Sequence, residues 1–165
     1  DDCAVLDGGW KSWKSAGFPV DVGPAPSRPK TKFVTAPRTG LVADLTRMQE
    51  ALRDGTCVIN ALSPGNHDGS EEHYGRPGHL PGASNVYALH LLDPHTQCYL
   101  PLDQLKALFD EIASDDKPIV TYCGGGIAAT SDAFVLKALL GHDDVSVYDG
   151  SLSEWLLDPN RPLEV

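Results

Sequence analysis

Short apolar segments alternate with helical patterns over most of the chain, from about Phe33 to the C-terminus. Short, almost wholly apolar segments are typical of strands that are buried on both faces of a sheet. Strands separated by helices are most simply joined as parallel neighbours. We therefore predict an α/β fold, an α/β/α sandwich with a central parallel sheet. The predicted strands cover residues 57–60, 84–87, 118–122 and 145–148, and the predicted helices cover residues 44–53, 103–113 and 128–140.

The chain has 165 residues, of which 41% are hydrophobic and 22% are charged, so it can build a packed core. It holds 13 Lys and Arg against 23 Asp and Glu, which gives a net charge of −10. Because an acidic surface repels phosphate backbones, we expect no nucleic-acid partner. No apolar run reaches the roughly 18–20 residues that span a bilayer, so we expect a soluble protein without membrane contact. A local pocket can still bind a small anion.

Four cysteines, Cys3, Cys57, Cys98 and Cys123, lie far apart in the sequence. No two have the spacing of a zinc or redox pair, and four are too few for a disulfide scaffold. We expect no metal, and we expect reduced thiols in a reducing compartment, the cytoplasm. No leader of the secretory kind opens the sequence, which agrees with that expectation.

A short sequence pattern occurs at both ends of the chain. Residues 5–8 (VLDG) with Trp13 match residues 147–150 (VYDG) with Trp155, at a constant spacing. Each copy predicts a strand, an Asp-Gly turn and a short helix that carries the Trp. The match is either a coincidence or a sign of a repeat about one domain long.

If the pattern is a repeat, residues 1–22 are the tail of a preceding unit. A strand at residues 4–6 would then need the body of that unit as its partner. Residues 23–32 are rich in proline, which excludes a helix or a central strand, so we predict an extended linker. Residues 33–165 would form the catalytic domain.

The segment from Tyr122 to Thr130 has the features of a nucleophilic site. Cys123 leaves the carboxyl end of a predicted buried strand, where open α/β sheets place their sites. Gly124, Gly125 and Gly126 follow, and a helix begins after them. Glycines let several backbone amides converge on one point, and a helix start adds a partial positive charge. We expect these groups to hold the sulfur as a thiolate that needs no neighbouring base.

Three other interpretations of this segment remain. The cysteine could be a buried residue beside a glycine turn. Gly124, Gly126 and Ala129 match a dinucleotide fingerprint with Asp149 as the ribose-binding acid, but few residues follow Asp149 to build the remaining strands. A cysteine phosphatase would need an arginine where this chain has Ala129, so a phosphate would lack a cationic partner from the loop.

Two sequence elements together resemble the rhodanese family of sulfurtransferases. The first is the cysteine loop with its preceding strand and the later residues 149–155 (DGSLSEW). The second is residues 78–83 (GHLPGA). The repeated Asp-Gly and Trp pattern resembles the ends of the two halves in tandem members of the family. The resemblance covers residues 33–165 as one unit, with residues 1–22 as the tail of the other half.

The resemblance implies a mechanism and a set of site residues. Cys123 would take a sulfur atom from a small anionic donor, thiosulfate or 3-mercaptopyruvate, and hold it as a persulfide. A thiol or cyanide would then accept the sulfur, without a cofactor. The loop from Gly124 through Ile127 to Ala128 would bind the donor. The missing N-terminal half, on the same protein or another chain, would complete the cleft. The alternative is a rhodanese-like binding or regulatory module without activity.

The chain departs from the family pattern at several positions. Asn60, Leu62 and Asn66 stand where many members carry an Asp and two Arg residues, and the cysteine loop has no charged or hydroxyl side chain. The preference between the two donors therefore stays open. Arg76 is either a donor-binding residue or a solvated loop residue.

Three further residues are supporting candidates. We expect His79 to position its loop by hydrogen bonding. Asp149 and Ser151, after the last strand, either cap the final turn or contact the substrate.

Overall fold

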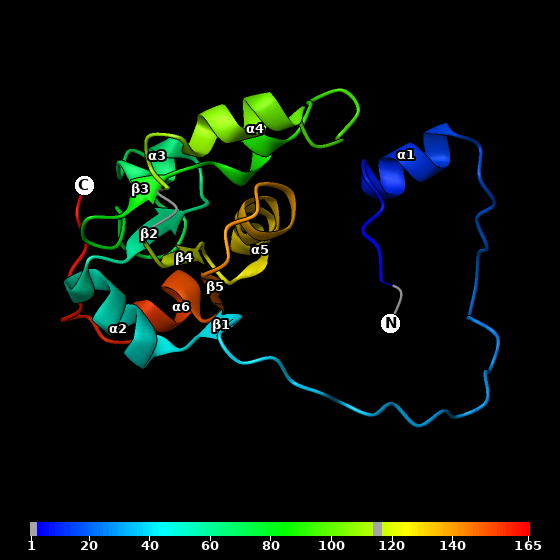
Figure 1. Cartoon of the computed structure of the whole chain (residues 1–165), viewed down its shortest axis with the longest axis horizontal. Helices are drawn as coiled ribbons and strands as arrows, with labels where there is room; N and C mark the ends of the chain where they lie inside the picture. The colour runs from blue at the N-terminus through cyan, green and yellow to red at the C-terminus, as the bar shows by residue number, and fades with distance from the viewer. Residues whose placement is uncertain (1–2, 114–116) are drawn as a thin grey trace.

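A five-stranded, all-parallel sheet forms the centre of the protein in a computed structural model, which describes residues 3–113 and 117–165 (Figure 1). The strand order is β1-β5-β4-β2-β3. This sheet confirms the predicted α/β class. The strands are β1 (Val42–Ala43), β2 (Cys57–Asn60), β3 (Ser84–Asn85), β4 (Ile119–Tyr122) and β5 (Val145–Tyr148).

Helices connect the strands, as the alternating pattern predicts. The first of them inside the sandwich begins after Asp44, whose carboxylate accepts a hydrogen bond from the Arg47 amide at 2.8 Å, and it ends at Gly55, whose φ of 82° closes the helix. The helical elements are α1 (Gly9–Ser15), α2 (Leu45–Asp54), α3 (Pro64–His67), the 3₁₀ turn η1 (Ala88–Leu91), α4 (Leu102–Phe109), α5 (Ile127–Phe134), the π turn η2 (Val135–Leu139) and α6 (Ser151–Trp155).

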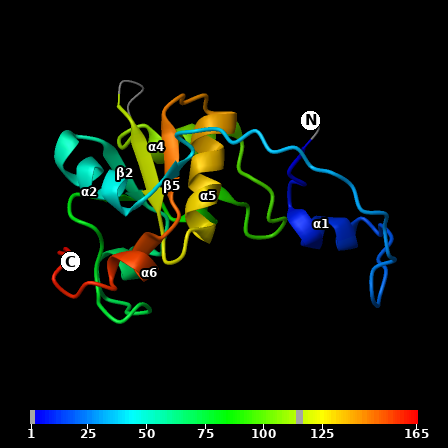
Figure 2. The same ribbon diagram turned by 90° about the horizontal axis from the view of Figure 1, so that it is seen from below.

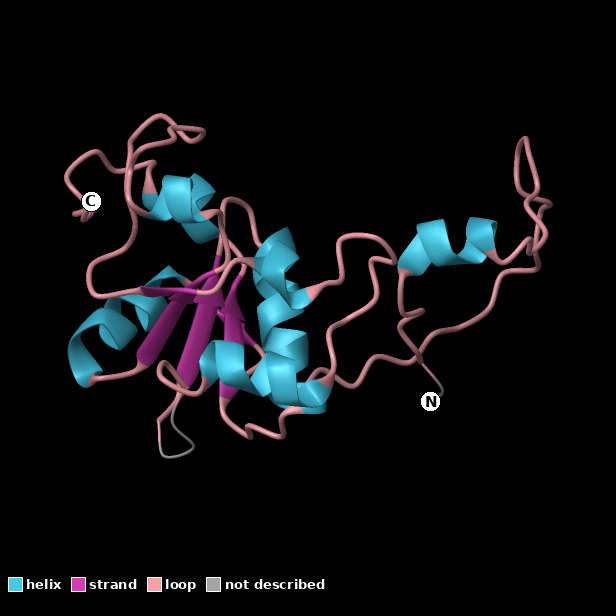
Figure 3. Ribbon diagram, turned by 90° about the horizontal axis from the view of Figure 1, so that it is seen from above, coloured by secondary structure: helices cyan, strands magenta, loops and turns pink. Residues whose placement is uncertain are grey.

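The sheet is covered on both faces, which is why all four residues of β4 are buried (Figure 3). Val120 and Tyr122 pack with Met48 of α2 and Trp155 of α6 on one face. Ile119 points to the other face, where it packs against residues of α4 and η2. The alternation of side chains along a strand therefore explains the continuous apolar sequence.

Several element boundaries differ from the predicted ones. The strand predicted for residues 84–87 has only two residues, and residues 33–41 form no helix or strand. The helix predicted to reach residue 113 ends at Phe109, because the amides of Ile112 and Ala113 both donate to the Phe109 carbonyl and close a turn. This turn brings Ile112 next to β2, where its carbonyl accepts a hydrogen bond from the Cys57 thiol at 3.2 Å.

The N-terminal segment lies apart from the sandwich (Figures 1 and 2). Helix α1 contacts the loop before α4, where the Tyr99 amide donates to the Asp7 carboxylate at 2.9 Å and the Lys11 ammonium donates to the His95 carbonyl at 2.6 Å. The strand expected at residues 4–6 is absent, and Val5 is 65% exposed, since no described strand lies beside it to share hydrogen bonds. Its need for a preceding unit stays a prediction, as do the domain boundaries.

None of the helices in residues 3–113 and 117–165 is long and apolar enough to cross a membrane.

Candidate active site

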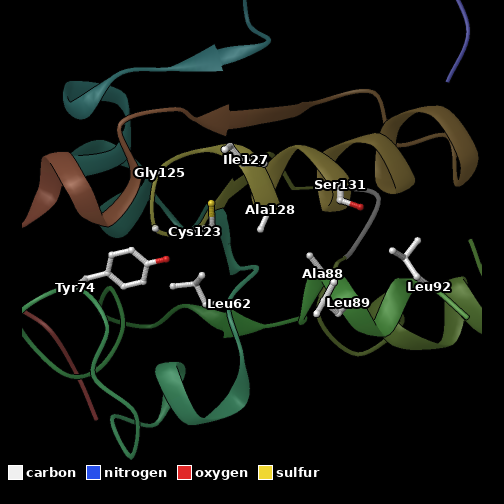
Figure 4. Close-up of a pocket in the computed structure, with 11 residues that line it drawn as sticks. Leu62, Tyr74, Ala88, Leu89, Leu92, Cys123, Gly125, Ile127, Ala128 and Ser131 are labelled. Atoms are coloured by element: carbon white, nitrogen blue, oxygen red, sulfur yellow. The ribbon is translucent and has the colours of Figure 1, made fainter. Parts of the chain in front are cut away.

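Cys123 lies at the carboxyl edge of the sheet, one residue after β4. Only 2% of the residue is exposed, but it lines a cavity of about 470 Å³ that opens beside the glycine loop (Figure 4). The short loop from Cys123 to Gly126 joins β4 to α5, so the strand and the helix together fix its two ends. The cavity is lined by Leu62, Tyr74, Ala88, Leu89, Leu92, Cys123, Gly124, Gly125, Ile127, Ala128 and Ser131.

The hydroxyl of Ser151 holds the cysteine loop in place by hydrogen bonds. It accepts hydrogen bonds from the amides of Cys123 and Gly126, both at 3.1 Å, and donates to the Tyr148 carbonyl at 2.8 Å. The same oxygen lies 4.0 Å from the Cys123 sulfur. Ser151 is fully buried and has a φ of 50°, which is uncommon for a residue with a side chain. A buried hydroxyl with three partners explains why the chain accepts that conformation.

The carbonyls of the loop are bound to the start of α6. The Cys123 carbonyl accepts from the Leu152 amide at 3.0 Å, and the Gly124 carbonyl accepts from the amide and hydroxyl of Ser153 at 2.9 and 2.7 Å. In a trans peptide the following N–H points opposite to the C=O. The amides of Gly124 and Gly125 are therefore turned away from α6.

Four amides of the cysteine loop and the first turn of α5 are free to donate. Within the described part of the chain, no group accepts a hydrogen bond from the amides of Gly124, Gly125, Ile127 or Ala128. Two of these belong to the first turn of α5, where helix amides lack internal partners. The loop therefore offers several donors to an anion held at Cys123.

The three loop glycines are not equivalent. A side chain at Gly124 would overlap the Tyr74 hydroxyl, and Gly126 has a φ of 86° with the Asp149 carbonyl 2.8 Å from the place of a Cβ. Gly125 has neither restriction, since the nearest atom to its Cβ position is 3.7 Å away. The backbone therefore requires glycine at Gly126, whereas a side chain at Gly124 would displace Tyr74.

Tyr74 is a cavity residue that the sequence analysis missed. Its side chain enters from the long loop between α3 and β3, and its hydroxyl points toward Cys123 (Figure 4). Partial burial, and secondarily the charge of Cys123, raise the pKa of the Tyr74 hydroxyl. The one available signal in the sequence is its place two residues before Arg76, in the segment that leads to the GHLPGA element, because no spacing rule relates Tyr74 to Cys123.

The other predicted site residues lie around this cavity rather than in it. The Arg76 guanidinium donates to the carbonyls of Pro159 and Arg161 at 3.2 and 3.0 Å, so it binds the C-terminal segment. Asp149 is exposed and lies against Gly126. Roles for Arg76 and Asp149 in substrate binding stay predictions.

His79 contacts the long loop and the C-terminal segment, and its supporting role stays a prediction. One ring nitrogen lies 2.7 Å from the His67 carbonyl, and its ring stacks on that of His67 with 3.7 Å between ring centres. Its backbone pairs with Glu164. The neighbouring Leu80 amide donates to the buried Tyr122 hydroxyl at 2.9 Å, which ties the loop to β4.

No charged side chain lines the cavity in the described part of the chain. A carboxyl on the buried face of α5, Asp132, has no hydrogen-bond partner, and burial raises its pKa well above the usual range. Burial therefore favours the neutral form of this carboxyl. Among the same residues, no three His, Cys, Asp or Glu side chains lie close enough together to hold a metal ion.

The sequence of residues 66–158, more than half of the chain, matches the family model of the rhodanese-like domain. The chain belongs to the rhodanese-like family, as the cysteine loop and the GHLPGA element predict. It is 34% identical to a thiosulfate/3-mercaptopyruvate sulfurtransferase 1, mitochondrial, from Arabidopsis thaliana, over 97% of this chain and 48% of that protein. It is 32% identical to a probable 3-mercaptopyruvate sulfurtransferase from Pseudomonas aeruginosa, over 99% of this chain and 58% of that protein.

A solved structure gives the same result for the fold. A persulfide-bearing variant of EanB, in complex with ergothioneine, superposes with a TM-score of 0.86 at 26% identity, over 100% of this chain and 42% of that chain. This chain therefore spans about half the length of the relatives that it matches.

Proposed function

We propose that the protein is a sulfurtransferase that carries a sulfur atom on Cys123 as a persulfide. The observation that carries the proposal is the position of Cys123 in a cavity, inside a loop whose free amides can stabilise an anionic sulfur. Relatives that cover nearly the whole chain are named as sulfurtransferases, which supports the same reaction.

The reaction has two steps. The Cys123 thiolate attacks the outer sulfur of a small anionic donor and forms a sulfur–sulfur bond, while sulfite leaves from thiosulfate, or pyruvate enolate from 3-mercaptopyruvate, with the electron pair of the broken bond. A thiolate or cyanide then takes the outer sulfur, and Cys123 leaves as a thiolate. The atoms and charges balance without an oxidant, a metal or a cofactor.

We further propose that residues outside this chain help to bind the donor. No cation lines the cavity in the described residues, and Arg76 is bound to backbone carbonyls. A second rhodanese half, on the same protein or another chain, would supply charge there, and exposed side chains such as Trp10 and Phe18 on the N-terminal segment offer it an apolar contact.

A reducing compartment suits the thiol chemistry, and the four cysteines are all free. We propose that the protein is located in the cytoplasm. One relative is named as mitochondrial.

Mass spectrometry of the intact protein tests the proposal. We expect incubation with thiosulfate or 3-mercaptopyruvate to add the mass of one sulfur atom, and we expect Cys123→Ser to add none. The relative rates with the two donors also rank them. No added sulfur with either donor, in a folded protein, would contradict the proposal and favour a binding module.

A further inference from the structure

The Tyr74 hydroxyl is an uncommitted donor that faces the reactive sulfur. It lies against Gly124, 2.0 Å from the place where a Cβ of that residue would stand. No described group accepts a hydrogen bond from it. Its side of the cavity faces apolar side chains such as Leu62 and Ala88 (Figure 4).

The other hydroxyls near Cys123 are already paired. Ser151 donates to the Tyr148 carbonyl. Ser131, which also lines the cavity, pairs with the Tyr99 hydroxyl at 3.0 Å. Tyr74 therefore has the one hydroxyl without a hydrogen-bond partner among the described side chains that line this cavity.

The Tyr74 hydroxyl keeps its proton at neutral pH. Burial, and secondarily the charge of Cys123, move its pKa upward from an ordinary value of 10. A phenol that stays protonated beside an anionic sulfur is a hydrogen-bond donor and not a base.

We infer that Tyr74 is a catalytic residue of the second step, in which it donates a hydrogen bond to the outer sulfur of the Cys123 persulfide. This inference rests on the proposed sulfurtransferase function. The persulfide extends from the Cys123 sulfur into the cavity that the Tyr74 side chain lines. Its outer sulfur carries the negative charge, and the acceptor, a thiolate or cyanide, is also an anion.

The hydrogen bond should speed the transfer of the outer sulfur to the acceptor. It withdraws charge from the outer sulfur, which lowers the repulsion against the incoming anion. The acceptor then bonds to the outer sulfur, the sulfur–sulfur bond breaks, and its electron pair stays on Cys123 as a thiolate. The phenol proton remains on Tyr74 throughout, so with cyanide two anions enter the step and two leave it.

The same hydrogen bond makes opposite predictions for two reactions of the persulfide. It makes the outer sulfur a better electrophile toward cyanide and a poorer nucleophile toward an alkylating agent. A role of Tyr74 in shaping the loop alone would not move the two rates in opposite directions.

The test compares Tyr74→Phe, which keeps the ring and loses the hydroxyl, with the parent protein. Cys123 is converted to the persulfide with polysulfide, so that binding of thiosulfate or 3-mercaptopyruvate does not affect the measured rates. Its discharge to cyanide and its alkylation by iodoacetamide are then followed by mass. We expect Tyr74→Phe to discharge about 10- to 100-fold more slowly, and to be alkylated faster, with an unchanged melting temperature.

Tyr87→Phe is the matched control, because Tyr87 packs on His90 outside the cavity. It should match the parent in both rates. Parental rates in Tyr74→Phe, or two rates that change in the same direction, would overturn the role of Tyr74 while the persulfide itself still forms. A parent protein that never holds the extra sulfur on Cys123 would overturn the sulfurtransferase proposal, and this inference with it.

Discussion

The two loops that enclose the cavity are held in different ways. The cysteine loop is short. Its amides at Cys123 and Gly126 bind Ser151, and its carbonyls at Cys123 and Gly124 bind the start of α6. The long loop that carries Tyr74 is held on both sides of that residue. Before it, the Asn60 side-chain amide contacts the His67 ring. After it, Arg76, His79 and Leu80 bind other segments. Its middle, residues 70–75, is exposed.

The difference separates two tasks. Hydrogen bonds to Ser151 and to the start of α6 position the nucleophile, and the backbone of the loop requires glycine at Gly126. The opposite wall comes from a loop that can change its length and side chains without disturbing Cys123. Substitutions in the first loop should therefore affect stability and activity together, and substitutions in the second should affect mainly the reaction.

Ser151→Ala should have the largest effect on the rigid loop. It leaves the amides of Cys123 and Gly126 and the Tyr148 carbonyl without their partner, and such losses cost about 2–4 kcal/mol in a buried site. Urea denaturation would measure the loss, and the rate of sulfur loading should fall with it.

Ser153→Ala is the matched control for that loop. Ser153 is exposed, and its hydroxyl shares the Gly124 carbonyl with its own amide. We expect a loss below about 1 kcal/mol. Equal losses for the two serines would contradict the role of Ser151 as the central support.

Two alanine substitutions in the cysteine loop compare a constrained glycine with a free one. Gly126→Ala places a side chain at a φ of 86° and 2.8 Å from the Asp149 carbonyl, which should cost about 2 kcal/mol. Gly125→Ala meets neither restriction and should change the free energy of unfolding by less than about 0.5 kcal/mol. Thermal unfolding of the pair measures the difference, and a larger cost for Gly125→Ala would contradict the geometry.

The pH dependence of stability tests the long loop. Burial, and then the neighbouring His79, lower the pKa of His67 from 6.5 to about 4. Between these values the unfolded chain binds more protons than the folded one, so stability should fall as the pH falls from 6.5 to 4. Because the ring is only half-buried, we expect a loss of about 1 kcal/mol. His67→Gln should flatten the profile over that range, and an unchanged slope would refute the assignment.

The sequence predicted the features that depend on local pattern. The apolar strands and the capped helices gave the α/β/α sandwich, and the strand, cysteine and glycines at Cys123 gave the family. Ser151 was a supporting candidate because it follows the Asp-Gly pattern, but its double acceptor role depends on the left-handed backbone that points its hydroxyl into the loop.

Contacts between distant segments could not be predicted in this way. Tyr74 reaches Gly124 only because the long loop folds back over the carboxyl edge of the sheet. Arg76 is bound by the carbonyls of Pro159 and Arg161, near the other end of the chain. Neither pairing has a spacing or a periodicity in the sequence, since each depends on the path of a loop.

Amide chemical shifts would reveal whether the free loop amides hold an anionic sulfur at Cys123. Proton–nitrogen spectra would be recorded before and after Cys123 is loaded with one sulfur. We predict large downfield proton shifts for the amides of Gly124, Gly125, Ile127 and Ala128, and a small shift for Gly126, whose amide already binds Ser151. Unmoved resonances at the four free amides would contradict the account.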